Sequence, residues 1–290
     1  MIKFTALARA SILVFLATAP TAPAAEVKLQ DTPIPFSVPK VSDIPRGEKG
    51  DAILLGRRLM SETKRLLPDH VGAEMNCSSC HLLAGKVPFG SPFLGTSRAF
   101  PQYNPRAGRE VTLAERVNGC FLRSMNGTPL PAESREMKAF LAYMEWLSEG
   151  LPPGKGKLPI QGTGIGKINT DLVPDPVNGR RIYDRDCVTC HGSNGEGLTD
   201  SQGEYVFPPL WGDKSFNLGA GMARTYTAAA FVYRNMPLAH GMNGLLGQGG
   251  ALTEQEAVDV AEYFSHQPRP DFPAKAKDWP KGGRPKDARE

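Results

Sequence analysis

The sequence predicts an all-α protein built from two similar domains, and three observations lead to that prediction. The motif C-x-x-C-H occurs twice, at residues 77–81 and 187–191. Similar short segments flank both copies, and apolar residues recur at helical spacing after each copy. No segment shows the sustained alternation of apolar and polar residues that is typical of strands. Short helices separated by many Gly and Pro residues favour an all-α fold packed around a cofactor.

The first residues of the chain have the layout of a secretory signal peptide. Lys3 and Arg9 precede a short apolar run over residues 10–17, and small residues follow it. We therefore expect cleavage after Ala24 or Ala25 and export, most simply to a bacterial periplasm. No other stretch reaches the roughly 20 apolar residues of a spanning helix, so the sequence predicts no membrane span.

The charge balance excludes one class of function. The formal net charge is +4, and loss of residues 1–24, which hold two basic and no acidic residues, lowers it to +2. A nucleic-acid-binding protein of this kind would be far more basic, so we expect no nucleic-acid partner. The remaining length, about 265 residues, suits one large or two small domains with real cores.

C-x-x-C-H is the attachment signature of c-type haem. Cysteines at i and i+3 of a helical turn present both sulfurs on one side, where they form thioethers, and the next residue, His, reaches the iron. A zinc site rarely places His directly after C-x-x-C, and a thioredoxin-like redox pair needs no His there. The chain is therefore predicted to carry two covalently bound haem c groups, one on Cys77, Cys80 and His81 and one on Cys187, Cys190 and His191.

The repeat extends beyond these motifs, which favours two domains. The segment GRRL at 56–59 matches GRRI at 179–182, and PFLG at 92–95 matches PLWG at 209–212. Capping boxes at Thr112 to Glu115 and Thr253 to Glu256 each predict a helix start near the end of a unit. The predicted fold class is two tandem class I c-type cytochrome domains joined by a Gly/Pro-rich linker.

The predicted boundaries are a signal peptide at 1–25, an N-terminal cytochrome c domain at 26–150, a linker at 151–176, a C-terminal cytochrome c domain at 177–268 and a tail at 269–290. The segment from residue 268 to the end is rich in Pro, Lys and Asp. Such a composition predicts a tail that wraps loosely or is disordered.

The second axial ligand of each iron decides between electron transfer and chemistry. In the second unit the candidates are Met222, Met236 and Met242. Met236 follows one predicted helix and precedes the terminal one, so we favour it, with Met242 as the main rival. Ordinary core packing is the alternative for each methionine.

The first unit offers a cysteine for the same role. Met236 lies 20 positions after Phe216, and Cys120 lies 20 positions after Phe100. This matching spacing predicts that the Cys120 thiolate binds the first iron. The alternatives for an odd cysteine in an exported protein are a buried structural thiol or an intermolecular disulfide.

The chain resembles the dihaem thiosulfate dehydrogenases. The resemblance rests on RVNGCFLRSMNG at 116–127, the two haem motifs, PLWG at 209–212 and GAGMAR at 219–224, and it covers nearly the whole mature chain. It implies coupling of two thiosulfates to tetrathionate, a reaction that can run in reverse. It also implies an external electron acceptor, such as a small cytochrome c or a high-potential iron-sulfur protein.

The resemblance also implies residue roles. It places His81 and Cys120 on the catalytic iron and His191 and Met236 on the electron-transfer iron, with Arg106, Arg116 and Ser124 helping to hold the substrate beside Cys120. Some members carry a lysine before the methionine and exchange ligands there, but this chain has Asn235. We therefore expect no exchange of methionine for lysine at the second iron. Lys214 is a weak candidate for such a ligand.

The expected chemistry agrees with these roles. Thiosulfate is a dianion, and the planar guanidinium of Arg106, Arg116 or Arg123 suits an oxyanion. The alternatives are that these arginines bind haem propionates or lie on a solvated helix face. A thiolate ligand lowers the iron potential and a methionine raises it, so electrons should pass from the Cys120 haem to the Met236 haem.

Two other functions fit part of the sequence. One is a dihaem electron-transfer cytochrome that serves a separate dehydrogenase, which thiosulfate alone would not reduce. The other is a sulfur-carrier cytochrome of the multienzyme sulfur-oxidation system, which also uses a Cys-ligated haem. Such a carrier needs a partner cytochrome for turnover, whereas this chain holds its own second haem motif.

Overall fold

The structure is a computed structural model that describes residues 33–153, 156–238 and 249–289. The predicted signal peptide, with its cleavage site after Ala24 or Ala25, and the rival ligand Met242 lie outside these residues. Among the described residues, no helix has the length and apolar character needed to cross a membrane.

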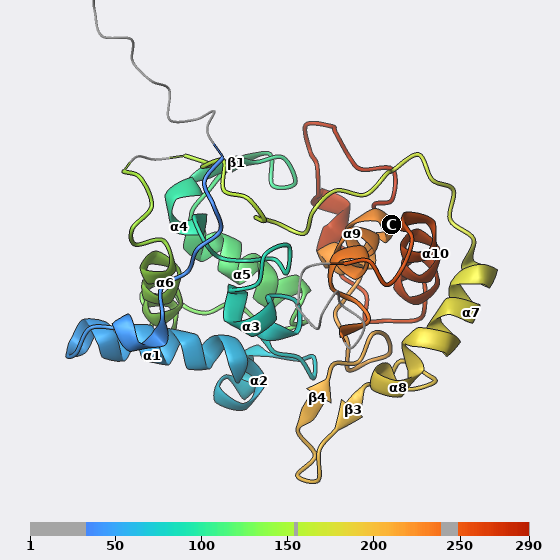
Figure 1. Ribbon diagram of the computed structural model, residues 1–290, viewed down its shortest axis with the longest axis horizontal. Helices are drawn as coiled ribbons and strands as arrows, with labels where there is room; N and C mark the ends of the chain where they lie inside the picture. Colours follow the sequence, from blue (N-terminus) through green and yellow to red (C-terminus); the bar gives the residue numbers. More distant parts are fainter. Residues whose placement is uncertain (1–32, 154–155, 239–248, 290) are drawn as a thin grey trace, which may run out of the picture. The chain divides into compact units, whose positions relative to one another are not determined.

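Helices dominate the described chain, as predicted (Figure 1). The first half contains α1 (Glu48–Ser61), α2 (Thr63–Leu66), α3 (Leu82–Gly85), α4 (Thr96–Ala99), α5 (Leu113–Arg123) and α6 (Arg135–Leu147). The second half contains α7 (Pro176–Asp186), α8 (Val188–His191), α9 (Thr225–Asn235) and α10 (Glu254–Ser265). Short 3-10 helices lie at Val41–Asp43, Pro68–His70, Cys77–Ser79, Gly221–Ala223 and Pro273–Lys277.

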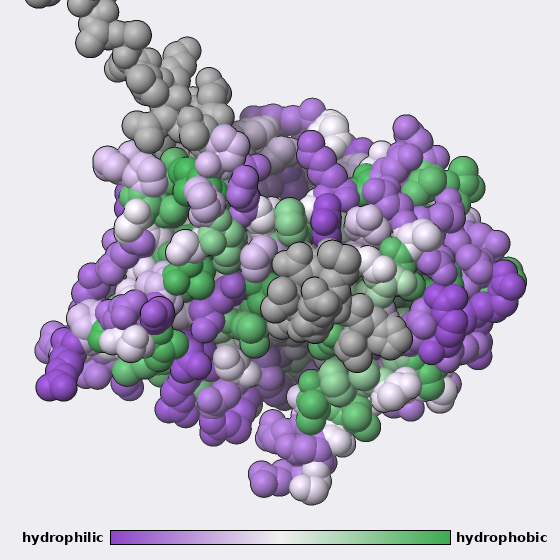
Figure 2. Space-filling model, in the orientation of Figure 1, coloured by the Kyte–Doolittle hydropathy of each residue, from purple (hydrophilic) through white to green (hydrophobic). Residues whose placement is uncertain are grey.

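Two small antiparallel hairpins, which the sequence did not predict, interrupt the helices. Strands β1 (Gln102–Asn104) and β2 (Arg109–Val111) pair in the first half, and β3 (Leu198–Thr199) and β4 (Tyr205–Phe207) pair in the second. Each hairpin closes one loop between helices, and neither of them forms a layer of the hydrophobic core. On the face in Figure 2, hydrophilic residues cover most of the surface and hydrophobic ones gather near the base of the β3–β4 hairpin.

The repeated G-R-R segments have a packing role in both halves. Helix α1 packs against α6, and α7 packs against α10. A Cβ at Gly56 would lie 2.0 Å from the Ala139 carbonyl oxygen of α6, and a Cβ at Gly179 would lie 2.0 Å from the Asp259 carbonyl oxygen of α10. Glycine therefore allows the first and last helices of each half to cross at backbone contact.

The two predicted capping boxes are present. The Thr112 hydroxyl accepts a hydrogen bond from the Glu115 amide at 3.2 Å, and the Glu115 carboxylate accepts one from the Thr112 amide at 2.8 Å. Thr253 and Glu256 repeat this arrangement at 3.2 and 2.9 Å. These boxes fix the first residues of α5 and α10.

The C-terminal tail is more ordered than its composition predicts. Its backbone pairs with the loop at 212–218, where Gly212 donates to the Pro268 carbonyl at 2.8 Å and Leu218 donates to the Pro270 carbonyl at 3.0 Å. The Asp278 side chain is only 6% exposed and forms ion pairs with Arg106 and Arg123. The expectation of a loose tail is therefore wrong, because long-range pairing of this carboxylate holds the segment in place.

The glycine contacts lead to a stability prediction. Gly179→Ala should lower the free energy of unfolding by about 1–3 kcal/mol, because its methyl group would overlap the Asp259 carbonyl and push α7 from α10. Thermal unfolding of the holo-protein measures this. Gly119→Ala in α5 is the control, because a Cβ there meets nothing within 4 Å. Equal unfolding temperatures for the two variants would contradict the packing role.

Candidate functional site

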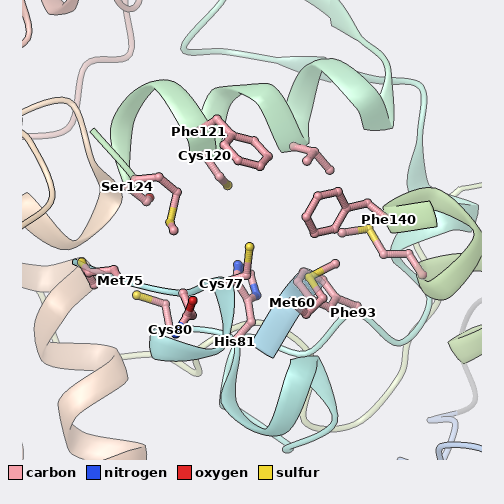
Figure 3. Close-up of a pocket in the computed structure, with 14 residues that line it drawn as sticks. Met60, Met75, Cys77, Cys80, His81, Phe93, Cys120, Phe121, Ser124 and Phe140 are labelled. Carbon is pink, nitrogen blue, oxygen red and sulfur yellow. The ribbon is translucent and has the colours of Figure 1, made fainter. Parts of the chain in front are cut away.

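A cavity in the first half collects the residues of the first C-x-x-C-H motif (Figure 3). The apolar lining consists of Met60, Met75, Phe93, Val117, Phe121, Met125, Phe140 and Met144. The polar and sulfur-bearing lining consists of Asn76, Cys77, Cys80, His81, Cys120 and Ser124.

His81 is held in an orientation suited to bind a metal. Its Nδ1 lies 2.6 Å from the Ser91 carbonyl oxygen, and its ring stacks on Phe93 with centroids 4.3 Å apart. A carbonyl oxygen only accepts hydrogen bonds, so Nδ1 carries the proton and the Nε2 lone pair is free. This is the tautomer that an axial imidazole requires.

Helix α5 supplies the opposite wall. Val117, Cys120, Phe121 and Ser124 recur at helical spacing and all line the cavity. Figure 3 shows the Cys120 sulfur pointing into the cavity from one side and His81, Cys77 and Cys80 approaching from the other. The predicted ligand pair His81 and Cys120 thus lies on opposite sides of one cavity.

A cation lies directly beside the Cys120 sulfur. The Nη1 of Arg116, one turn earlier in α5, lies 3.1 Å from Sγ. Burial raises the pKa of the Cys120 thiol, but the charge of Arg116, the nearby His81 and the hydrogen bond from Arg116 outweigh burial and lower the pKa to about 6. Cys120 is therefore mainly a thiolate at neutral pH.

The residues of this cavity fit a covalently bound haem. Cys77 and Cys80 lie on one short turn, whose Cys77 amide donates to the Thr63 hydroxyl at 2.9 Å. A free imidazole nitrogen faces a thiolate across the cavity, and the remaining walls are apolar. Thiols for two thioethers, two axial donors and a dry pocket are what haem c needs.

The second motif has the same local geometry. Cys187 begins the turn that continues as α8, and Nδ1 of His191 lies 2.9 Å from the Pro208 carbonyl oxygen. His191 is buried, and burial lowers the pKa of its ring, which keeps the imidazole neutral and able to ligate. These residues too fit a covalently attached haem.

The two sixth-ligand candidates occupy different local structures. Cys120 lies within α5, whereas Met236 caps the C-terminal end of α9. The spacing from the repeated phenylalanine is the same, but α5 begins later along its unit because the β1–β2 hairpin precedes it. Met222 and Met236 both pack against the apolar cluster that contains Phe231. Ligation by Met236 remains a prediction.

Arg106 and Arg123 converge on one buried carboxylate. Arg123 donates twice to Asp278, at 2.9 and 2.7 Å, and the Nε of Arg106 lies 3.1 Å from the same carboxylate. Arg106 also donates to the Gly219 carbonyl at 2.9 Å and lies over the Trp279 ring at 4.7 Å. Burial, together with the charges of Arg123, Arg224 and Arg116, lowers the pKa of Arg106 to about 10.

The predicted substrate residues therefore form two groups. Arg116 and Ser124 lie with Cys120 at the cavity and its edge. The charge of Arg116 helps to lower the pKa of Arg106, but the Arg106 guanidinium is paired with Asp278 in the C-terminal tail. Sequence reasoning missed Asp278 and Trp279, because nothing in a Pro- and Lys-rich tail marks one acid as the partner of a distant arginine.

The Asp278 contacts give a second stability prediction. Asp278→Asn should destabilise the holo-protein by about 3–5 kcal/mol, because two guanidinium groups, on side chains only 22% and 19% exposed, lose their counter-charge. Asp271→Asn is the matched control, since Asp271 is an exposed tail acid that pairs with Lys275. Urea unfolding midpoints compare them. A midpoint for Asp278→Asn as high as that of the control would show that the pairing is unimportant.

Two families of known proteins match the two halves of the chain. The family described as SoxA/TsdA, cytochrome c domain, matches residues 69–152, and the family described as cytochrome c matches residues 176–267. These two matches and the helical structure confirm the predicted fold class of two tandem cytochrome c domains. Both families bind haem c, so haem c is the cofactor of this chain.

Relatives match most of the chain. It is 45% identical over 254 residues to the thiosulfate dehydrogenase of Psychrobacter arcticus, covering 88% of this chain and 74% of that protein. It is 41% identical to the thiosulfate dehydrogenase of Allochromatium vinosum, covering 82% of this chain and 86% of that protein.

A solved structure agrees with these relatives. The thiosulfate dehydrogenase TsdBA from Marichromatium purpuratum matches with a TM-score of 0.73 and 36% identity. The match covers 82% of this chain and 50% of that chain, so this chain spans half the length of the TsdBA chain. By fold, by haem motifs and by similarity over most of its length, the chain belongs to the thiosulfate dehydrogenase family.

Proposed function

We propose that this chain couples two thiosulfates oxidatively to tetrathionate, with Cys120 as both haem ligand and covalent sulfur acceptor. The observation that carries the proposal is the Cys120 thiolate, which faces His81 across an apolar cavity and has Arg116 at 3.1 Å. The relatives in Psychrobacter arcticus and Allochromatium vinosum bear the name thiosulfate dehydrogenase, which supports the substrate.

The proposed haem sites use the residues already described. Cys77, Cys80 and His81 with Cys120 hold the first haem, and Cys187, Cys190 and His191 with Met236 hold the second. When bound, the two haems accept the two electrons that the coupling releases, one electron each. The polypeptide supplies the nucleophile, the counter-charges and the dry surroundings.

The first half-reaction joins one thiosulfate to Cys120. Cys120 would be free to react when it does not serve as a haem ligand, and a new S–S bond would then form between its Sγ and the outer sulfur of thiosulfate, which gives Cys–S–S–SO₃⁻. A thiolate of charge −1 and a dianion become an adduct of charge −1, so two electrons leave the sulfur atoms. Arg116 offsets the negative charge that meets at Sγ, and Ser124 offers a hydroxyl to the substrate at the same wall.

The second half-reaction needs no further oxidation. The outer sulfur of a second thiosulfate attacks the adduct sulfur that is bonded to Sγ, the bond to Sγ breaks, and tetrathionate leaves as a dianion. The Cys120 thiolate is regenerated with its low pKa. A covalent adduct divides one encounter of two dianions into two encounters of a dianion with a monoanion, which lowers the repulsion in each.

The surrounding arginines support this step electrostatically. Arg106, Arg123 and Arg224 lie close enough to affect one another, and Asp278 balances only part of their charge. The remaining positive charge attracts a dianion toward Cys120. We propose that Arg106 acts on the substrate mainly through this field, because its guanidinium is already bonded to Gly219 and Asp278.

The electrons are proposed to leave through the second haem to an external acceptor. A small cytochrome c or a high-potential iron-sulfur protein in the periplasm would suit that role, and the reaction can reverse when the potentials favour it. Lysine-for-methionine exchange at the second haem is not proposed. Asn235 is buried and bonded to the carbonyls of Phe89 and Phe231, and Lys214 is exposed beside Tyr205.

The adduct mechanism predicts the behaviour of Cys120→Ala. The variant should keep both covalent haems but lose turnover by about 10³-fold or more, because no nucleophile remains. Thiosulfate oxidation with ferricyanide as acceptor gives the rate, and the pyridine haemochrome gives the haem content. Leu122→Ala, an exposed neighbour on α5, is the control. A near-native rate in Cys120→Ala would exclude the adduct, and no reduction of either wild-type haem by thiosulfate would instead indicate a plain electron carrier.

The Arg116 contact predicts a pH effect. Because the thiolate is the reactive form, the wild-type rate should fall as the pH drops through about 6, where Cys120 is protonated. Arg116→Gln removes the cation that lowers this pKa, so the acid limb of the profile should move to higher pH. The measurement is kcat/KM for thiosulfate against pH, with Arg135→Gln on the exposed surface of α6 as control. An unshifted acid limb in Arg116→Gln would rule out this role.

A further inference from the structure

Arg269 is a partly buried cation with no acidic partner among the residues that the structure describes. Its Nε and Nη1 atoms are buried and have no hydrogen-bond partner in the protein. Its Nη2 donates to the Phe264 carbonyl at 2.6 Å, and its guanidinium stacks on the Phe216 ring at 4.2 Å. Burial lowers the pKa of Arg269 to about 9, and the other charge acting on it is a second cation, Arg289.

This arrangement is costly for the protein alone. A buried charge is normally paired or fully hydrogen-bonded, because each unmade hydrogen bond of a buried polar group is destabilising. Arg269 has two such nitrogens and no carboxylate, and Arg289 adds like charge. The site as built by the polypeptide therefore lacks one anion.

The position of Arg269 indicates where that anion comes from. Residues 268 and 270 are hydrogen-bonded to Gly212 and Leu218, which holds Arg269 against the loop that contains Phe216. The same loop begins after Pro208, whose carbonyl orients the ring of His191.

Trp211 ties this loop to the second haem motif, because its ring centroid lies 5.1 Å from that of Tyr183 in α7, which ends just before Cys187. Phe216, later in the same loop, is 3% exposed. Arg269 therefore lies beside the wall of the second haem-binding unit.

We propose that Arg269 binds a propionate carboxylate of the haem attached to Cys187 and Cys190. The inference rests on the second haem of the proposed function. Haem carries its two carboxylates on one edge, and a propionate oxygen can accept from the guanidinium nitrogens that lack partners. The stacking on Phe216 fixes the plane of the guanidinium, so the donors are already oriented.

Such a contact would influence electron transfer as well as cofactor binding. A cation beside the haem stabilises the reduced iron, which carries one positive charge less, and so raises the reduction potential. It also keeps the propionate ionised near neutral pH. Arg269 would thus help to make the second haem the electron acceptor of the pair.

The test uses holo-protein with Arg269→Gln, with Arg269→Lys as the conservative variant. Arg181→Gln is the matched control, because Arg181 is exposed on α7 of the same half and contacts Asn178. Spectroelectrochemical titration gives the potentials of both haems, and the first haem serves as an internal reference. Haem content by pyridine haemochrome confirms that both cofactors are attached.

In Arg269→Gln the second haem should become harder to reduce by about tenfold, equivalent to about 59 mV for one electron. Its potential should also become more dependent on pH between 5 and 8, while the first haem is unchanged and Arg269→Lys restores most of the shift. A second-haem potential equal to that of Arg181→Gln would overturn the inference.

A free oxyanion from solvent has the same chemistry as a propionate, so a sulfate titration separates the two. If sulfate shifts the second-haem potential of the wild type but not of Arg269→Gln, the anion comes from solvent and the propionate contact is wrong. No sulfate effect, together with the shift in Arg269→Gln, supports the propionate. A wild-type chain with a single haem would contradict the proposed function and this inference with it.

Discussion

A thiolate that lines an apolar cavity requires a cation beside it, and this requirement governs the candidate site. Arg116 meets it because helical geometry places its guanidinium one turn from the Cys120 sulfur. The start of α5 is fixed by the Thr112 and Glu115 capping box, so the register of both residues is set locally. The same face of α5 also places Ser124 and the apolar residues Val117 and Phe121 in the cavity wall. The position of Arg116, the position of Cys120 and part of the cavity wall therefore all depend on α5.

The two halves show how one architecture can present two different candidate sixth ligands. Both cross their first and last helices at a glycine, and both orient the motif histidine with a backbone carbonyl. They differ in the candidate sixth ligand, since Cys120 lies within a helix and Met236 lies at a helix end. The β1–β2 hairpin delays the start of α5, which is why Cys120 lies inside its helix. The spacing from Phe100 to Cys120 is nevertheless 20 residues, the same as from Phe216 to Met236.

The features that could be predicted from the sequence were local or repeated. The haem motifs, the capping boxes and the spacing of Cys120 all lie within short windows or within one internal repeat. The pairing of Arg106 with Asp278 and the burial of Arg269 could not be predicted, because each joins segments far apart in the chain and depends on tertiary packing. The composition of the tail gave a wrong prediction of disorder. A polar segment can be ordered when one of its carboxylates is buried and pairs with two arginines, as Asp278 does.

The contact between Asp278 and the arginines also constrains the order in which the molecule can be completed. The tail belongs to the last part of the chain to be made, yet its carboxylate holds Arg106 and Arg123 in the first half. These two arginines can take the arrangement described here only when the C-terminal segment has docked. A chain interrupted before residue 278 would therefore leave both guanidinium groups without this shared carboxylate.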